Sequence, residues 1–192
     1  MDARIKAVTF DEEAHKYFFD GKELHGVTGA IGKLMGKSFP DTDVVKLATM
    51  YGSDVHKEVE NYYNHEGKLS TEAAKWVVEE LSRKADEWTF DFVEGIESEV
   101  MVSDFEGTAS KVDVVMRTYG GNVWLFDIKT TSKFDRAYCS LQLSVYKKLY
   151  EKCYGGTVCG MFVLGTKSRR TFRIIEQEDS KVQKILDMNK GV

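Results

Sequence analysis

The sequence has little proline, few cysteines and no long hydrophobic run. One proline stands beside 16 glycines among 192 residues, and 42% of the residues are apolar while 30% are charged. This composition excludes collagen-like, fibrous and wholly disordered proteins. No stretch approaches the roughly 18 to 20 apolar residues of a membrane span, and acidic residues precede any sustained apolar run, so we expect neither membrane insertion nor secretion.

The cysteines point to a reducing compartment. Cys139, Cys153 and Cys159 are odd in number and lie in apolar surroundings. That is typical of free thiols rather than of a disulfide framework, and it predicts a cytoplasmic location. A length of 192 residues suffices for one sizeable core, so we expect a single domain over 1–192.

Charge is distributed unevenly along the chain. The net charge is −4, yet residues 129–192 hold 13 lysines and arginines against 6 acidic residues. The basic final third would attract a polyanion, while the acidic remainder would repel it. Ordinary solvated lysines on a helix and strands explain the same numbers, so the asymmetry alone does not decide.

Periodicity predicts the order of secondary structure. An N-terminal hairpin and connecting segment occupy 1–42, with Asp20-Gly21 as the two-residue turn. From 43 onward we expect two helices, three strands, a helix, two strands and a closing helix. This order predicts an α/β domain with a mixed central sheet flanked by helices. The expected ranges are strands 5–10 and 16–19, helices 43–63 and 71–88, strands 95–104, 110–119 and 122–131, helix 135–152, strands 158–166 and 170–178, and helix 179–190.

Charged residues stand at the end of the third central strand. Asp127 and Lys129 are two apart and therefore share a face, whereas the strand is apolar on both sides. Asp113 lies within the preceding apolar strand, and the hairpin would bring its carboxylate beside that of Asp127. Two close carboxylates repel, and a divalent cation is the usual remedy. The pattern predicts a magnesium or manganese site beside a lysine; a structural salt bridge between Asp113 and Lys129 is the alternative.

These residues carry a resemblance to a known family. Asp113 followed by Asp127-Ile128-Lys129 on consecutive strands resembles the PD-(D/E)XK nuclease superfamily. Gly52-x-x-x-His56 and Gln142-x-x-x-Tyr146 resemble elements of its RecB-type branch, and the N-terminal hairpin resembles that of phage-encoded, exonuclease-like members. The similarity spans about residues 10–164, and it implies a restriction-endonuclease-like core. The proline that usually precedes the family's first aspartate is replaced by Val112.

The resemblance implies a set of metal ligands. Asp113 and Asp127 would bind Mg²⁺ or Mn²⁺ together with the carbonyl of Ile128. His56 would be an added ligand, and an imidazole in an oxygen-rich site favours manganese. Standing alone, His56 would more often be a partly buried histidine with a structural role.

The resemblance also implies catalytic groups. Lys129 would orient or deprotonate the attacking water, or stabilise the transition state, and the sequence does not separate these roles. Glu99 matches the accessory acid of the family. Glu97 is two residues away on the same face, and we favour Glu99.

Nucleic-acid contacts are expected from two places. Gln142 and Tyr146 lie on one helix face, where both would contact phosphate; an ordinary interface pair is the alternative. Lys167, Arg169 and Arg170 form either a clamp for the DNA backbone or a charged hairpin tip.

The function implied is hydrolysis of DNA by a metal-dependent exonuclease of phage or prophage type, acting in recombination or repair within the bacterial host cytoplasm. The expected partner is linear DNA, with a homo-oligomer or a recombination protein as further partners. A non-catalytic nuclease-fold module that binds nucleic acid or protein is the alternative. Some RecB-type nucleases hold an iron–sulfur cluster on four cysteines, and with three present we expect none.

Overall fold

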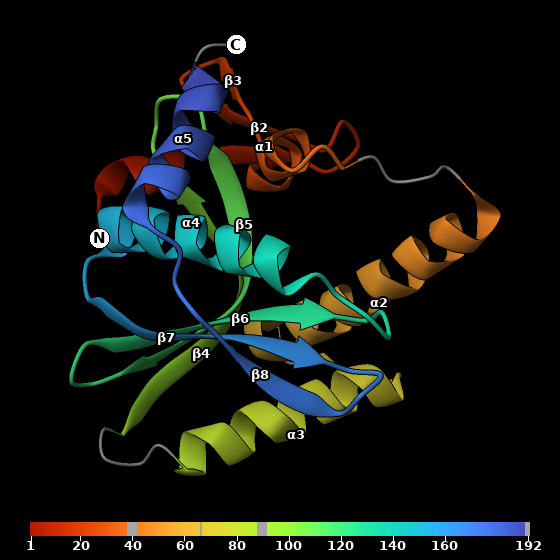
Figure 1. Ribbon diagram of the computed structural model, residues 1–192. Helices are drawn as coiled ribbons and strands as arrows, with labels where there is room; N and C mark the ends of the chain where they lie inside the picture. The colour runs from red at the N-terminus through yellow and green to blue at the C-terminus, as the bar shows by residue number, and fades with distance from the viewer. Residues whose placement is uncertain (38–41, 66, 88–91, 191–192) are drawn as a thin grey trace.

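The computed structural model describes residues 1–37, 42–65, 67–87 and 92–190. None of the helices in these ranges is long and apolar enough to cross a membrane. Figure 1 labels most of the elements, which are η1 (Ala3–Ala7), β1 (Thr9–Asp11), β2 (Lys16–Phe19), β3 (Lys22–Leu24), α1 (Val27–Leu34), α2 (Asp43–His65), α3 (Glu72–Glu87), β4 (Val93–Ser103), β5 (Ala109–Thr118), β6 (Asn122–Lys129), α4 (Arg136–Tyr154), β7 (Thr157–Gly165), β8 (Arg170–Ile174) and α5 (Asp179–Lys190).

The main sheet has five strands in the order β4-β5-β6-β7-β8. β6 and β7 are parallel, while the other neighbours are antiparallel. Parallel neighbours need a crossover connection, and α4 supplies it. The predicted mixed α/β architecture is confirmed, as is the order of elements from α2 onward.

Helices cover both faces of this sheet (Figure 1). On one face, α4 buries Leu143 among side chains that include Leu125 of β6. On the other face, α2 and α3 bury Val55 and Leu81 among side chains that include Phe126. Because adjacent residues of β6 enter opposite cores, this strand is central and apolar on both sides, as the sequence predicted.

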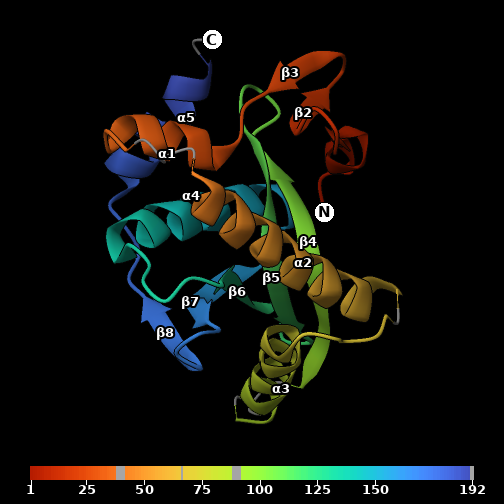
Figure 2. The same ribbon diagram turned by 90° about the vertical axis from the view of Figure 1, so that its right-hand side faces the viewer.

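The N-terminal region is a second, three-stranded antiparallel sheet in the order β1-β2-β3 (Figure 2). The hairpin turn at Asp20-Gly21 is confirmed, with φ values of 49° and 76° that suit a two-residue turn of type I′. The predicted strand over 5–10 is wrong, since residues 3–7 form a 3₁₀-helix and the strand begins at Thr9. The Asp2 carboxylate caps this turn by accepting a hydrogen bond from the Arg4 amide at 3.0 Å.

Helix α1 was not predicted from the sequence. Gly26, Gly29 and Gly32 obscure its helical pattern, because glycine lowers helix propensity. Burial overrides that preference, since Val27 and Ile31 are fully buried beside α4 and α5. The helix expected over 71–88 runs from 72 to 87, with residue 88 outside the described ranges, and β8 ends at 174 rather than 178.

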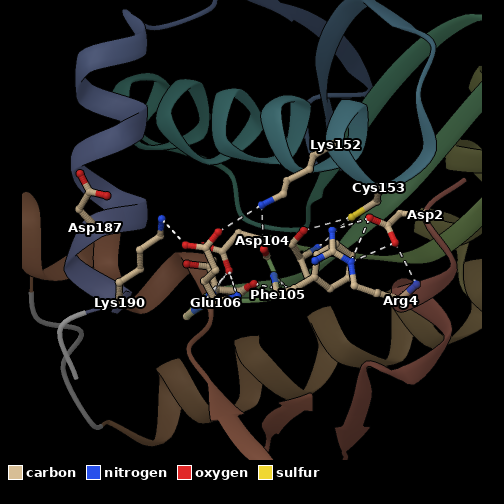
Figure 3. Close-up of polar contacts among 12 residues, drawn as sticks. Asp2, Arg4, Asp104, Phe105, Glu106, Lys152, Cys153, Asp187 and Lys190 are labelled. Atoms are coloured by element: carbon tan, nitrogen blue, oxygen red, sulfur yellow. Dashed lines mark hydrogen bonds and ion pairs between the residues drawn. The ribbon is translucent and has the colours of Figure 1, made fainter. Parts of the chain in front are cut away.

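The loop between β4 and β5 ties both ends of the chain together (Figure 3). The buried Asp104 accepts hydrogen bonds at Oδ1 from the amides of Glu106, Gly107 and Thr108, at 2.8 to 2.9 Å. Lys190 of α5 forms an ion pair with Glu106 at 2.6 Å. Near the N-terminus, the guanidinium of Arg4 lies 4.3 Å from the centre of the Phe105 ring in the same loop.

Candidate metal centre

Asp127 and Lys129 lie at the carboxyl end of the central strand β6. Asp127 is 1% exposed, and its Oδ1 accepts a hydrogen bond from Lys129 Nζ at 2.9 Å. Its Oδ2 is 2.8 Å from the same Nζ but has no hydrogen-bond partner among the described residues. The two side chains share a face, as their spacing predicted, and form a largely buried ion pair.

Asp113 reaches the same strand end from β5. The β5–β6 register pairs Val114 with Phe126, so its next step sets Asp113 opposite Asp127. The ladder stops there, and Asp113 Oδ2 instead accepts a hydrogen bond from the Ile128 amide at 2.6 Å. The hairpin therefore brings the two acids to adjacent strands, as expected. The predicted alternative, a salt bridge between Asp113 and Lys129, is replaced by the ion pair within β6.

His56 enters from helix α2, which passes close to the end of β6. A Cβ atom at Gly52 would lie 3.0 Å from Thr130 Oγ1, so glycine at this position permits the close approach. One turn further on, His56 Nε2 lies 3.3 Å from the Ile128 carbonyl oxygen. If Nε2 donates to that carbonyl, the lone pair of Nδ1 faces the carboxylates.

The structure separates the two glutamates of β4. Glu97 forms an ion pair and hydrogen bonds with Arg117, whereas Glu99 Oε1 lies 3.6 Å from His56 Nδ1. Asp113 Oδ2 lies 3.7 Å from the same nitrogen. Glu99 has a φ of 54°, and this distortion of β4 places it apart from Glu97. Glu99 rather than Glu97 therefore lies beside His56, and its role as the accessory acid stays a prediction.

One ligand atom from each of His56, Glu99 and Asp113 lies within 4.8 Å of the other two. Two carboxylates and one imidazole form a donor set that suits a divalent cation. Asp127 and the Ile128 carbonyl, which were expected as ligands, lie beside this group and are engaged with Lys129 and His56. The structure thus brings His56 and Asp113 of the expected metal site together with Glu99, while no carboxylate oxygen of Asp127 belongs to this group. The roles of Asp127 and of the Ile128 carbonyl as ligands stay predictions.

Burial and neighbouring charges shift the pKa values of the site. Burial raises the pKa of Asp113, and the nearby Glu99 raises it further, against the opposing charges of His56 and Lys129. Burial likewise raises the pKa of Asp127. For His56, burial lowers the pKa, but the carboxylates of Asp113 and Glu99 outweigh it and raise the value to about 9. A bound cation would favour the ionised form of both aspartates, against the effect of burial.

Lys129 is held as an ammonium. Burial lowers its pKa, but the carboxylates of Asp127 and Asp113 outweigh that and raise it above the ordinary value for lysine. About a quarter of its side-chain surface stays exposed. The ammonium is therefore fixed by Asp127, while part of the lysine side chain stays exposed.

Gln142 and Tyr146 are buried on the face of α4 that packs against the sheet. Gln142 Nε2 donates to the Tyr146 hydroxyl at 3.0 Å, and Ser110 Oγ of β5 donates to the same hydroxyl at 3.1 Å. Gln142 is 4% exposed, and its Oε1 has no hydrogen-bond partner among the described residues. The two side chains contact each other and the strand that carries Asp113; contact with phosphate stays a prediction.

The three basic residues lie in and beside the turn between β7 and β8, and all are exposed. Lys167 Nζ lies 5.0 Å above the ring of Tyr51 in α2, and Arg169 Nη2 lies 3.8 Å from a Glu72 carboxylate oxygen. The turn begins beside Lys129, since the Thr166 amide donates to the Lys129 carbonyl at 3.0 Å. The acidic cluster therefore lies at the same end of the sheet as Lys167, Arg169 and Arg170.

Two residues near the cluster were missed from the sequence. Asn64 of α2 forms hydrogen bonds to the backbone of Ser98, and Ser98 Oγ donates to the Asp113 carbonyl at 2.7 Å. Neither residue belongs to a motif, and an asparagine on an exposed helix face gives no signal in the sequence.

Comparisons with known proteins assign this chain to no family, so the interpretation of the site rests on its geometry. No protein-family model matches the chain, and no curated protein matches its sequence. Among solved structures, a crystal structure of a "Putative exonuclease" from Eubacterium rectale is similar to 88% of this chain and 77% of its own, with 14% identity and a TM-score of 0.39. Similarity this low carries no argument about function.

Proposed function

We propose that this protein is a divalent-metal-dependent nuclease that hydrolyses phosphodiester bonds of DNA. The observation that supports it is the convergence of His56, Glu99 and Asp113 beside the Asp127–Lys129 ion pair, at one end of a central strand. We further propose that the five-stranded sheet and its helices form a restriction-endonuclease-like core, in keeping with the order of elements.

The residues present fit a hard divalent cation. His56, Glu99 and Asp113 would hold it, with the carboxylate of Asp127 close by, and the imidazole favours Mn²⁺ over Mg²⁺. When bound, such a cation neutralises charge on the phosphate and lowers the pKa of a water molecule. Its binding would release the proton that the acids otherwise hold on His56.

The remaining residues of the site act on the substrate and the water. Lys129 presents an ammonium to the phosphate, where it stabilises the negative charge that develops during in-line attack. Asp127 fixes the position of that ammonium through the ion pair within β6. A pre-oriented charge in a largely buried site costs little reorganisation when the reaction occurs.

The basic turn would bind the nucleic-acid backbone. The exposed side chains of these three residues, Lys167, Arg169 and Arg170, lie at the same end of the sheet as Lys129. A nucleic-acid strand that crosses the site would therefore contact them. Exonucleolytic action, a phage-type role in recombination or repair, and assembly into an oligomer belong to this proposal through the family resemblance alone.

The test uses the purified protein with end-labelled linear single- and double-stranded DNA in Mg²⁺, Mn²⁺ or EDTA. We expect metal-dependent cutting, faster in Mn²⁺, and a loss of at least about 100-fold in Lys129→Ala, because a preorganised charge contributes that much. The product ladder separates exonuclease from endonuclease action. Lys133→Ala is the matched control, since Lys133 is exposed in the loop after β6 and its ammonium has no partner among the described residues.

One result would replace this proposal with another. If the wild type cuts nothing in any metal but still retards DNA in a gel shift, the protein is a non-catalytic binding module. A thermal melt of Lys129→Ala is needed beside the assay, because removing one member of a buried ion pair also lowers stability.

A further inference from the structure

Strand β4 is distorted at Glu99. Ser98 pairs with Val114 and Val100 pairs with Val112, so the register is the same on both sides, but Glu99 and Asp113 between them do not form a ladder pair. Glu99 has a φ of 54°, in the left-handed region that L-residues seldom adopt. Such a conformation persists in a strand only where the surroundings hold it.

The side chain of Asn64 holds the residue next to this distortion. Asn64 Nδ2 donates to the Ser98 carbonyl at 2.9 Å, and Asn64 Oδ1 accepts from the Ser98 amide at 3.2 Å. Strand β4 is at the edge of the sheet, so the amide of Asn64 takes the place of a neighbouring strand at this residue. On its other side, Ser98 Oγ donates to the Asp113 carbonyl at 2.7 Å.

Helix α2 carries both Asn64, whose two hydrogen bonds to Ser98 we call the clamp, and the candidate ligand His56. Asn64 follows His56 by eight residues, or about 12 Å along α2. The position of β4 against α2 at Asn64 therefore sets how far Glu99 lies from His56, which is 3.6 Å between the nearest atoms.

We infer that Asn64 is a positioning residue for the cation site, acting through the backbone of Ser98 to present Glu99 and Asp113 to His56. The inference rests on the proposed function where it concerns the cation. Residues that orient metal ligands typically change metal affinity by 10- to 100-fold when they are replaced. An exposed asparagine with a merely structural role would change stability slightly and leave the affinity for metal unaltered.

Two measurements on the full chain test the inference. The first is the affinity for Mn²⁺, from the electron paramagnetic resonance signal of free Mn²⁺. The second is hydrogen–deuterium exchange of the segment 93–103 in EDTA. The variants are Asn64→Ala, which removes both hydrogen bonds, and Asn64→Asp, which keeps only an acceptor for the Ser98 amide. Asn61→Ala is the control, because Asn61 lies on the same helix and its side chain forms no hydrogen bond with a described residue.

We expect Asn64→Ala to bind Mn²⁺ about tenfold more weakly and to exchange faster in that segment, with Asn61→Ala matching the wild type. Asn64→Asp should retain more protection of the segment than Asn64→Ala. Excess Mn²⁺ should restore the nuclease activity of Asn64→Ala but not that of Lys129→Ala. Unchanged affinity in Asn64→Ala would overturn the positioning role, whatever its melting temperature.

The exchange measurement separates this inference from the proposed function. If the wild type binds no Mn²⁺, the proposed cation site is wrong, and the role of Asn64 toward a cation is overturned with it. If the wild type binds Mn²⁺ and exchange in EDTA is the same in Asn64→Ala and the wild type, the clamp does not hold β4, and only this inference is overturned.

Discussion

Asp104 and Asp113 both belong to the β4–β5 hairpin and expose little of their side chains to solvent, but their surroundings differ. Asp104 Oδ1 accepts three backbone amides from its own loop (Figure 3), whereas Asp113 accepts one backbone amide and lies close to Glu99 and Asp127. The amides around Asp104 organise a loop, whereas burial, together with the nearby Glu99, raises the pKa of Asp113. The comparison teaches that a largely buried acid with few donors and other acids beside it marks a candidate functional site, whereas burial of an acid alone does not.

The largest effect should follow loss of the structural acid. Asp104→Ala leaves three amides in a largely buried loop without their acceptor. We expect the free energy of unfolding to fall by about 3 kcal/mol, since hydrogen bonds to a charged group are strong. The melting temperature should drop by about 6 to 12 °C. Metal-dependent activity below the transition should persist, and its loss in a folded variant would mean that the loop also serves the site.

Asp113→Asn should have the opposite effect, with stability retained and metal-dependent activity lost. Because the pKa of Asp113 is raised in the fold, its ionised form opposes folding at neutral pH, and an uncharged amide relieves that. In EDTA we expect stability to be unchanged or to rise by up to about 1 kcal/mol, because removing strain at functional sites commonly stabilises. Mn²⁺ should raise the melting temperature of the wild type but not of this variant.

A calorimetric scan of both proteins with and without Mn²⁺ checks the second prediction. A fall of several degrees for Asp113→Asn in EDTA would contradict it and would place Asp113 with Asp104 as a structural acid. The Asp113→Asn protein should also fail to cut DNA although it folds, which would show that Asp113 is needed to bind the cation and not to stabilise the fold.

The sequence predicted the parts of the site that follow regular periodicity. Asp127 and Lys129 share a face because side chains alternate along a strand. His56 was expected only from the family resemblance of Gly52-x-x-x-His56, and the close approach of Gly52 to Thr130 became evident in the structure. The distortion at Glu99 was out of reach, since a glutamate in the left-handed region depends on hydrogen bonds from Asn64 that are remote in the chain. A residue's φ is decided there by tertiary contacts rather than by local preference.

The errors at the N-terminus have a similar cause. The pattern of residues 5–10 suits a strand, but the Asp2 cap stabilises a 3₁₀ turn that begins before it. Helix α1 forms in spite of three glycines in and beside it because burial of Val27 and Ile31 outweighs propensity. Local patterns therefore predicted the central sheet well and the peripheral segments poorly, since the latter depend more on contacts with the rest of the molecule.

The smallest expected effect is at Glu80, which tests whether an acid with several donors behaves as Asp104 does rather than as Asp113 does. It is a buried acid of α3 with several partners, namely hydrogen bonds from Arg83 and from the hydroxyl of Thr171. The hydrogen bond from Arg83 lowers its pKa, against the opposing effect of burial, and Thr171 adds to the lowering. Glu80 should therefore behave as Asp104 does in our comparison, and unlike Asp113.

The sign of its pH dependence follows from that lowered pKa. Ionised Glu80 stabilises the fold above the ordinary pKa of a glutamate, and the contribution is lost as the pH falls through the lower value of the folded state. At pH 7, Glu80→Gln should lower the melting temperature by about 1 to 3 °C, because Arg83 is solvent-exposed. As the pH falls through the lowered pKa of Glu80, the two melting curves should converge. A gap that widens on acidification would show that Glu80, like Asp113, is an acid that the fold holds at a cost.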